Sequence, residues 1–411
     1  MKKSILLGLG IVLMVTQGFT QVVTIAAADV QNEFISSTDD NDYVKTKFFS
    51  KTYSVSKNSK LNLTNTYGKI TIKTWDKNEV KAEVEMKASS NREKDAIDLI
   101  NGISILESQV SDAVSIKTQI EKTSRGFGSV FNNGKIISQR QLNVNYTIYM
   151  PSSMALAATM VYGDINILTF NGPTNFKVQY GNLNAEDLNS SNNIVSVQYG
   201  NVNLKNVTKA TISQQYGKAV NILDVDDLTL SVQYAGADIA NIKGKAMIKA
   251  QYANNIKIGT VEDLDLNAQY SSVNIGHVKQ YAIIRQQYNV LNIGIINRLQ
   301  LSSQYVSVNI NDLKSDAVIK STYNKVNVNK VYSSVKKLDV VTNYTSVSLG
   351  FDSAFSGDLD VTTRYTSLNS GRYRLSKISE NSDTKVFQGQ IGNGGTSSVS
   401  IKAEYGSLTL K

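Results

Sequence analysis

A tyrosine that recurs about every eighteen residues is the feature of this sequence that most restricts its fold. The spacing between successive members stays between 17 and 19 residues for ten tyrosines and then widens to 21 for two more. These residues are Tyr162, Tyr180, Tyr199, Tyr216, Tyr234, Tyr252, Tyr270, Tyr288, Tyr305, Tyr323, Tyr344 and Tyr365, and Tyr405 follows in a related context. A fixed period of this length is typical of chains whose repeats stack on one another.

The residues around each tyrosine alternate between apolar and polar. Around Tyr270, apolar residues occupy positions −6, −4, −2, 0, +3, +5 and +8, with a polar break at +1 and +2. A period of two is typical of strands that bury one face. We therefore expect two short strands that meet at a corner in each repeat, with the tyrosine ring pointing inward. Gln214 and Gln286 replace a small residue at −2, and either bond a tyrosine hydroxyl or mark rings that turn outward.

One repeat is too thin to bury its own apolar face, so neighbouring repeats must stack and pair their strands in parallel. The sequence therefore predicts an all-β protein, a parallel single-stranded β-solenoid (β-helix) with rungs of about 18 residues. In this arrangement the tyrosines form one file along the core. Offset ring contacts would add about 0.5–1.5 kcal/mol per pair.

The N-terminus has the form of an export signal, with a basic start and a short apolar run within residues 1–15. We assign residues 1–28 to a signal peptide that is cleaved after Thr20 or after Ala28, and a retained anchor is the alternative. Residues 29–44 are mostly polar and are expected to form a flexible leader. Export to the periplasm, the outer envelope surface or the extracellular space follows, with no transmembrane span after signal cleavage.

Residues 45–150 lack the eighteen-residue period and contain longer strand-like runs. They are expected to form a β-rich cap that covers the terminal rung of the repeat domain, residues 151–411. One short helix is predicted from Ser90 to Ile103, with Ser90 or Asn91 as its N-cap. Asn133-Gly134 has the composition of a hairpin turn.

Two columns of amide side chains accompany the tyrosines. Position −1 is glutamine in Gln179, Gln198, Gln215, Gln233, Gln251, Gln269, Gln287 and Gln304. Position +4 is asparagine in Asn166, Asn184, Asn203, Asn274, Asn292, Asn309 and Asn327. Stacked amides either reinforce the strands along the stacking direction or form a surface that hydrogen-bonds sugars, and both roles are compatible. The candidate binding residues are Gln198, Gln233, Gln251, Gln269, Asn274, Asn292 and Asn309.

Most catalytic and metal-binding sites need residues that this sequence lacks. It contains no cysteine and a single histidine, His277 on a predicted outward turn, which excludes thiol nucleophiles and multi-histidine metal sites. Two acidic clusters lie at predicted turns, Asp224/Asp226/Asp227 and Glu262/Asp263/Asp265. Paired-carboxylate catalysis, or Ca²⁺ binding by the first cluster, is the alternative to solvated turns. We expect no catalytic residue, metal site or cofactor.

Two segments carry a resemblance to a known family. Residues 65–76 (NTYGKITIKTWD) combine a turn, a strand and a Trp-Asp pair, and an apolar strand that ends in Pro151 precedes the Gly-led alternation at 160–167 (MVYGDINI). Together they resemble the "putative adhesin" family of repeated β-strands, exported bacterial proteins without an assigned biochemical activity. The resemblance extends over roughly residues 53–411 and implies a β-solenoid in the cell envelope or outside the cell. It carries over no catalytic residues.

These observations predict a non-enzymatic, exported, adhesin-like binding protein of the cell envelope or cell surface. Its Gln and Asn ladders would bind glycans or other envelope or surface components through many weak contacts on a rigid rod. The net charge of +9 is scattered along the chain, which favours mild attraction to anionic surfaces and excludes a nucleic-acid footprint. Two alternatives stay open: a polysaccharide-active β-helix enzyme, and a structural or signalling envelope protein that acts through a protein partner. The oligomeric state is not specified by the sequence.

Overall fold

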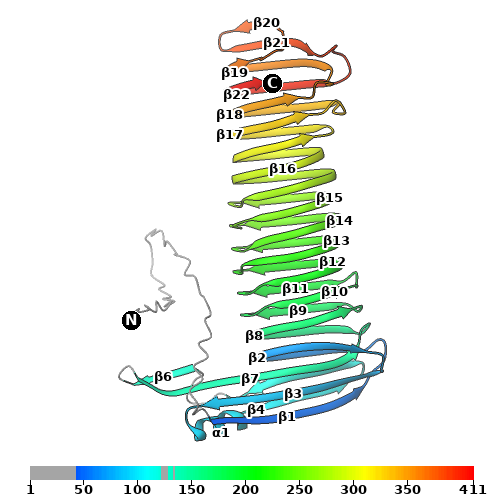
Figure 1. Cartoon of the computed structure of the whole chain (residues 1–411), viewed down its shortest axis with the longest axis vertical. Helices are drawn as coiled ribbons and strands as arrows, with labels where there is room; N and C mark the ends of the chain where they lie inside the picture. Colours follow the sequence, from blue (N-terminus) through cyan, green and yellow to red (C-terminus); the bar gives the residue numbers. More distant parts are fainter. Residues whose placement is uncertain (1–42, 122–127, 133–134) are drawn as a thin grey trace. The chain divides into compact units, whose positions relative to one another are not determined.

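Strands account for nearly all of the secondary structure in the computed structural model of the protein, which describes residues 43–121, 128–132 and 135–411 (Figure 1). The all-β class is therefore confirmed. The strands belong to one mixed sheet of 22 strands, and the described residues include one short helix. The predicted signal peptide, most of the predicted leader and the Asn133-Gly134 turn lie outside the described residues.

The N-terminal region forms the mixed end of the sheet. Its strands are β1 (Tyr43–Ser54), β2 (Lys60–Trp75), β3 (Glu79–Ser90), β4 (Ile103–Val110), β5 (Ala113–Ile120), β6 (Gly128–Asn132), β7 (Lys135–Pro151) and β8 (Ala155–Phe170). β3 pairs antiparallel with β1 and β7, β4 with β5, and β6 with β7. β2 pairs in parallel with β5, β7 and β8. This region therefore joins directly onto the first of the stacked repeats.

The helix α1 (Glu93–Asn101) begins three residues later than predicted. β3 continues to Ser90, which pairs with Arg140 of β7, so the chain is still extended at the predicted N-cap. The residue before the helix is Arg92, whose side chain makes no capping hydrogen bond in the described part of the chain. The predicted cap at Ser90 or Asn91 is therefore wrong. A buried ion pair between Arg140 Nη2 and Asp95 Oδ1, 2.7 Å apart, ties α1 to β7.

From β8 onward, successive repeats pair in parallel (Figure 1). Partner residues lie 17 to 21 positions apart in the sequence, as in Gln198 with Gln215, Val202 with Val220 and Ala317 with Leu338. The strands are β9 (Thr174–Gln179), β10 (Leu183–Leu188), β11 (Asn193–Gln198), β12 (Val202–Gln215), β13 (Ala219–Gln233), β14 (Gly236–Gln251), β15 (Ile256–Gln269), β16 (Val273–Leu313), β17 (Ala317–Val331) and β18 (Lys337–Phe351). Each residue type therefore recurs beside its counterpart in the next repeat.

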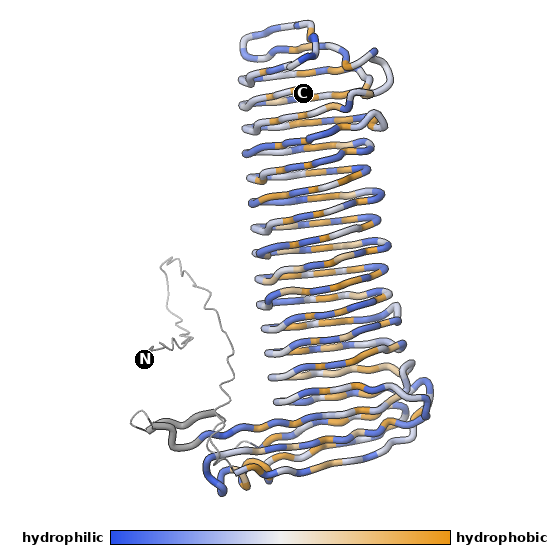
Figure 2. Tube along the Cα trace, viewed as in Figure 1, coloured by the Kyte–Doolittle hydropathy of each residue, from blue (hydrophilic) through white to orange (hydrophobic). Residues whose placement is uncertain are grey.

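The core lies between two layers of strands, those that precede each tyrosine and those that follow it. Apolar and polar residues alternate along the strands of the parallel repeats (Figure 2). In the repeat around Tyr270, positions −6, −4, −2, +3, +5 and +8 are buried as predicted, namely Leu264, Leu266, Ala268, Val273, Ile275 and Val278. Inward side chains of both layers belong to one continuous hydrophobic cluster.

The tyrosines point outward, which corrects the expectation of a tyrosine file in the core. Each repeat tyrosine has a positive φ of 47–63°, and those from Tyr162 to Tyr405 are 37–51% exposed. Where the tyrosine alone is left-handed, it shifts the alternation by one position, so the residue at +1 points inward in its place. Asn289 and Asn324, at +1 in their repeats, differ: they also have a positive φ and are exposed. Ala235, Ala253 and Ser271, at +1 in their repeats, are accordingly buried.

Position +1 is crowded by the backbone of the preceding repeat. A Cβ at Gly200 would lie 1.6 Å from the carbonyl oxygen of Gly181, and a Cβ at Gly181 would lie 1.9 Å from that of Gly163. No heavy atom can approach so closely, so these corners require glycine. The Tyr-Gly pairs of the sequence are thus a packing requirement of the corner.

The two buried glutamines at −2 bind the corner backbone. Gln286 Nε2 donates to the carbonyl oxygens of Ser271 and Val290, each at 3.0 Å. Gln214 Nε2 donates to the carbonyl oxygen of Gly200. The two expectations for these glutamines are therefore both wrong. Their amides bond backbone carbonyls and not a tyrosine hydroxyl, and they do not mark special repeats, because the rings point outward in all repeats.

Antiparallel strands end the parallel stack at its C-terminal side. The strands there are β19 (Gly357–Asn369), β20 (Leu375–Asn381), β21 (Thr384–Ile391) and β22 (Ser398–Leu410). β22 lies between β18 and β19 and is parallel to both. β21 pairs antiparallel with β19 and β20, so it occupies the edge that β19 would otherwise leave open.

Candidate functional site

Fourteen left-handed tyrosines stack face to face, and we call this set the tyrosine ladder. Successive ring centroids lie 4.4–5.2 Å apart, and the ring planes deviate by at most 16°. Their order in space is Tyr67, Tyr162, Tyr180, Tyr199, Tyr216, Tyr234, Tyr252, Tyr270, Tyr288, Tyr305, Tyr323, Tyr344, Tyr405 and Tyr365. The ladder follows the strand order, with Tyr405 of β22 inserted before Tyr365 of β19.

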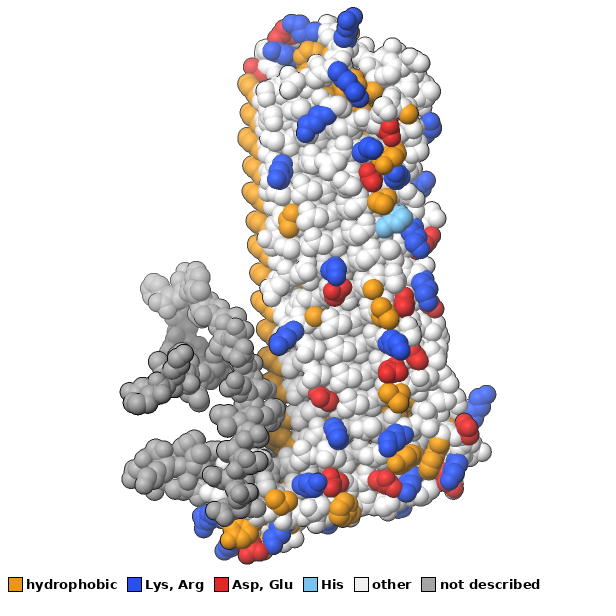
Figure 3. Space-filling model, in the orientation of Figure 1, with side chains coloured by type: hydrophobic (Ala, Val, Ile, Leu, Met, Phe, Trp, Pro, Cys, Tyr) orange, Lys and Arg blue, Asp and Glu red, His pale blue; other side chains and the backbone are white. Residues whose placement is uncertain are grey.

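Stacking decides which part of each ring meets solvent. Neighbouring rings cover both faces, so ring edges and phenol hydroxyls remain exposed. The ladder is consistent with the continuous hydrophobic stripe along the left edge of Figure 3. Contacts between neighbouring tyrosines also change their pKa values. The hydrogen bond with the Tyr288 hydroxyl raises the pKa of Tyr270 above its usual value.

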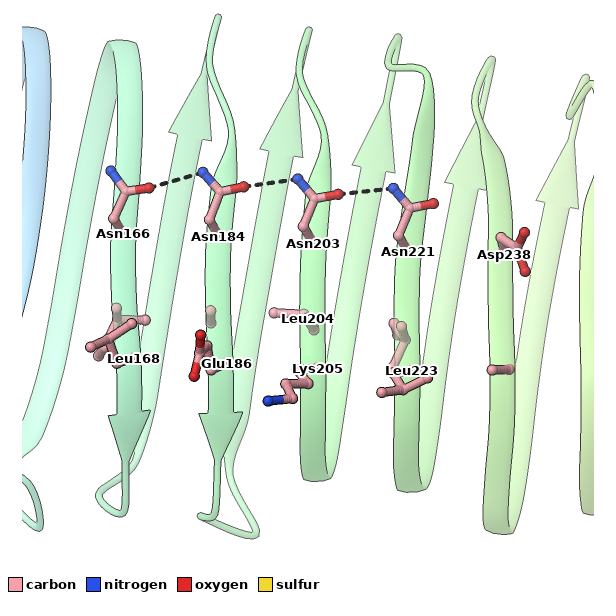
Figure 4. A pocket seen from close by; sticks show the side chains of 14 residues that line it. Asn166, Leu168, Asn184, Glu186, Asn203, Leu204, Lys205, Asn221, Leu223 and Asp238 are labelled. Carbon is pink, nitrogen blue, oxygen red and sulfur yellow. Dashed lines mark hydrogen bonds between the residues drawn. The ribbon is translucent and has the colours of Figure 1, made fainter.

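Asparagines at equivalent positions of successive repeats form a second ladder, the asparagine ladder. In its first run, Nδ2 of Asn184, Asn203 and Asn221 each donates to Oδ1 of the asparagine in the preceding repeat, beginning at Asn166, over 2.8–2.9 Å (Figure 4). The second run consists of Asn274, Asn292 and Asn309, with the same distances. Asn274 Nδ2 also donates to Oδ1 of Asn255 at 2.9 Å, although Asn255 lies two residues before the ladder position of its own repeat. An ion pair between Asp238 and Lys257, 3.1 Å apart, separates the two runs.

A shallow groove of about 640 Å³ lies over the first run of the asparagine ladder. Beside the amides it is lined by a second row of outward side chains, Leu168, Glu186, Lys205 and Leu223 (Figure 4). Leu168 is 66% exposed and Leu223 48%. The groove therefore offers amide groups next to apolar side chains, with two acidic residues, Glu186 and Asp238, and one basic residue, Lys205.

Glutamines at position −1 form the glutamine column on the other layer, next to the tyrosine ladder. Gln198 Nε2 donates to Gln215 Oε1 at 3.0 Å, and Gln251 Nε2 to Gln269 Oε1 at 3.3 Å. The candidate set from the sequence is therefore divided between two outer faces. Gln198, Gln233, Gln251 and Gln269 lie on the strands before the tyrosines, and Asn274, Asn292 and Asn309 lie on the strands after them.

Two features of the site escaped the sequence analysis. Asn221 belongs to the asparagine ladder but lies at +5 from Tyr216, because its repeat has one more residue after the corner. The sequence did indicate its role, because Asn221 follows the apolar Val220 as Asn203 follows Val202. The exposed tyrosine edges were missed because the tyrosines were assigned to the core.

The acidic residues are tied to the following repeat. Asp224 accepts from Asn241 Nδ2 at 3.0 Å, Asp226 pairs with Lys243 at 3.2 Å, and Asp227 accepts from the backbone N–H of Lys245 at 3.0 Å. Within the described ranges, no group of three or more His, Asp or Glu side chains is placed to hold a metal ion.

His277 lies in β16 opposite Thr260 of β15 and is half-buried. The predicted turn at this position is therefore wrong, whereas the histidine does lie on the surface, as Figure 3 shows. The strand continues through it because its repeat pairs in register with the preceding one.

Among the residues that the structure describes, no helix has the length and apolarity needed to cross a membrane.

No family model and no curated protein matches this chain. Among solved structures, a "putative cell adhesion protein" from Clostridium sporogenes shares 11% identity over 89% of this chain and 99% of that one, with a TM-score of 0.18. A "putative adhesin" from Parabacteroides distasonis shares 12% over 89% and 97%, with a TM-score of 0.18. A "putative lipid binding protein" from the same species shares 9% over 89% and 96%, with a TM-score of 0.16.

TM-scores this low do not establish a shared fold, so the ligand and function of this chain have to be argued from its own residues. Two of these three structures are named an adhesin or a cell adhesion protein, and the third is named a lipid binding protein.

Proposed function

We propose that this chain is an exported, non-enzymatic, adhesin-like protein of the cell envelope or cell surface that binds extended glycans. The observation that carries the proposal is the asparagine ladder. Each amide there uses one N–H and one oxygen lone pair to bond its neighbours. A second N–H and a second lone pair are left over on each inner residue. A donor and an acceptor are thus offered once per repeat, about 4.8 Å apart.

Sugar hydroxyls both donate and accept, so they are suited to such a row of amides. The exposed Leu168 and Leu223 beside the ladder would contact the apolar faces of sugar rings. Each contact is weak, but a chain-like ligand that engages several repeats gains from the high effective concentration of every further contact. Affinity should therefore rise with the length of the glycan.

The proposed architecture is a parallel β-solenoid over the repeat residues, with the N-terminal strands as a cap. Parallel partners 17–21 residues apart and the unbroken tyrosine ladder support it. Such a stack holds its outer faces rigidly, because each strand is bonded on both sides. Pre-organised ligand groups lose less entropy on binding than mobile ones.

The carboxylates support a binding role over catalysis. Glycoside chemistry needs two acids that face one another across a bond. Asp226 and Asp265 are paired with Lys243 and Arg285, respectively, as outward rows along the strands. Exposed ion pairs of this kind are ordinary features of a protein surface.

The test is glycan binding by the full chain and by the triple variant Asn184→Ala/Asn203→Ala/Asn221→Ala. We expect the full chain to bind at least one polysaccharide in an array and the variant to lose at least about tenfold in affinity, since each hydrogen bond contributes about 1 kcal/mol. Thr211→Ala/Thr229→Ala/Ser231→Ala, on the other layer, is the control and should bind normally. Folded protein that ignores every polysaccharide, or a ladder variant that binds like the control, would refute the proposal.

A further inference from the structure

The tyrosine ladder is a large exposed aromatic surface that the proposed glycan site does not use. Thirteen of its members are each 37–51% exposed. At roughly 200 Å² per tyrosine, this amounts to about 1,000 Å² of accessible surface. Contiguous apolar patches on monomers rarely exceed a few hundred Å², and larger ones mark interaction sites. A specific protein interface needs about 800 Å² from each partner, which the ladder supplies.

The geometry of the rings restricts the partner. Sugar rings and planar ligands bind aromatic residues through the open faces of the rings, but here neighbouring rings 4.4–5.2 Å apart cover those faces. What remains is a row of ring edges and hydroxyls with the spacing of a β-sheet. A partner should therefore present contacts at the same interval.

The positions next to the ladder carry few charges, although the chain contains 43 basic and 34 acidic residues. Basic residues occur one outward position further away, three residues before the tyrosines, at Lys177, Lys249, Arg285 and Lys320. From Tyr180 to Tyr344 the position before each tyrosine is Gln, Thr or Asn. Two residues after the tyrosines, the charged side chains over this stretch are Lys218 and Lys325. Figure 3 shows most charged side chains of the visible face away from the hydrophobic edge. The two rows that directly adjoin the rings therefore bring few like charges together, and the basic side chains lie at the border of the surface.

The same groups are self-complementary. A phenol hydroxyl donates one hydrogen bond and accepts others, and a glutamine amide does both. A row of tyrosines beside a row of glutamines can thus bond an identical pair of rows related by a two-fold axis, in which residue i meets j and j meets i. The distance between successive repeats is the same in both partners, because both have the same sequence.

We propose that the tyrosine ladder and the adjoining glutamine column are the interface with a second copy of this chain. The ring edges of one copy pack beside the glutamine column of the other, and their hydroxyls and amides bond across the two-fold axis. This pairing leaves the asparagine ladder exposed in both copies, because the ladder lies on the other layer. The dimer would carry two glycan-binding faces, but its formation does not depend on glycan.

Added charge beside the ladder tests the pairing without removing a ring. In Gln215→Lys/Gln233→Lys/Gln251→Lys, three charges of each copy face those of the other. The matched control, Thr211→Lys/Thr229→Lys/Met247→Lys, adds the same charges to the same three repeats, four residues before the glutamine column. The three added lysines repel one another equally within one copy in both variants. The two variants therefore differ only in where the added charges lie relative to the tyrosine ladder.

Sedimentation velocity of the full chain and both variants, at low salt and at 1 M salt, gives the outcome. We expect the full chain and the control to form dimers, and the glutamine variant to dissociate at least about a hundredfold more readily at low salt. High salt should restore much of the pairing, since the Debye length falls to about 3 Å at 1 M. A monomeric full chain, or equal dimerisation of the two variants, would overturn the proposal.

Discussion

At each corner of the repeat, tyrosine occupies a backbone conformation that favours glycine. A left-handed residue with a side chain costs about 1–2 kcal/mol, whereas a stacked ring pair contributes about 0.5–1.5 kcal/mol. The two effects are of similar size, so ring stacking offsets the strain only where neighbouring repeats are present. Tyr234, with rings at 5.2 and 5.1 Å on its two sides, is a typical case.

Substitution of Tyr234 separates backbone strain from stacking. Tyr234→Asn and Tyr234→Val both remove the ring, but asparagine tolerates the left-handed region and a β-branched residue does not. We expect Tyr234→Val to lower the free energy of unfolding by about 1–2 kcal/mol more than Tyr234→Asn. Urea denaturation followed by circular dichroism measures the difference. Equal midpoints for the two variants would show that the corner is not strained.

The core positions could be predicted from the sequence, but the direction of the tyrosine could not. Period-two alternation places Leu264, Leu266 and Ile275 inward, and they are buried. The same alternation, applied without interruption, also placed Tyr270 inward. A single positive φ reverses the phase. The indication of it in the sequence was the small residue at +1, which is Gly in the first repeats and Ala or Ser in the next three, before Asn289, Val306 and Asn324 replace it.

The candidate site was predictable in part. Column positions such as Asn274 and Asn292 follow from spacing alone, and their amides are bonded as a ladder. Their separation from the glutamine column was not predictable, because it depends on how the corner turns between two layers. The late start of α1 has a similar cause: β3 pairs with distant residues of β1 and β7, and this pairing extends the strand through Ser90.

At the level of strands, the repeat is the unit of stability. Each repeat bonds the preceding and the following one with the same inward and outward residues, as β14 does with β13 and β15. Stability in such arrays is close to a sum of repeat and neighbour contributions. One repeat should therefore be removable without loss of the remaining structure.

Deletion of residues 235–252 removes one complete repeat and joins Tyr234 to Ala253. The order of inward and outward residues is kept, because Ala253 occupies the same position in its repeat as Ala235. We expect this shortened chain to fold with an unchanged circular dichroism signal per residue. Deletion of residues 244–252 removes the strand before Tyr252 together with that corner, and misplaces the layers. This half-repeat variant should be expressed poorly or unfold at lower temperature. Equal thermal stability of the two deletions would contradict the repeat as a unit.

On the scale of the whole array, residues far apart in sequence become neighbours along the stacking direction. The tyrosine ladder, the asparagine ladder and the inward aliphatic residues all follow from one register, in which each repeat lies on the last. Antiparallel strands at both ends, β3 with β7 and β21 with β19, terminate that register. The proposed glycan site and the proposed dimer interface both depend on it.

Disulfide trapping tests this register most directly, because the chain contains no native cysteine. Asn203 and Asn221 are partners on adjacent strands, which places their Cα atoms about 4.8 Å apart, within the range that a disulfide bridges. Asn184 and Asn221 are separated by one further repeat, beyond that range. Under mild oxidation, we expect Asn203→Cys/Asn221→Cys to form an intramolecular disulfide rapidly and Asn184→Cys/Asn221→Cys to remain reduced. Equal trapping of the two pairs, or none in the adjacent pair, would contradict the stacked arrangement.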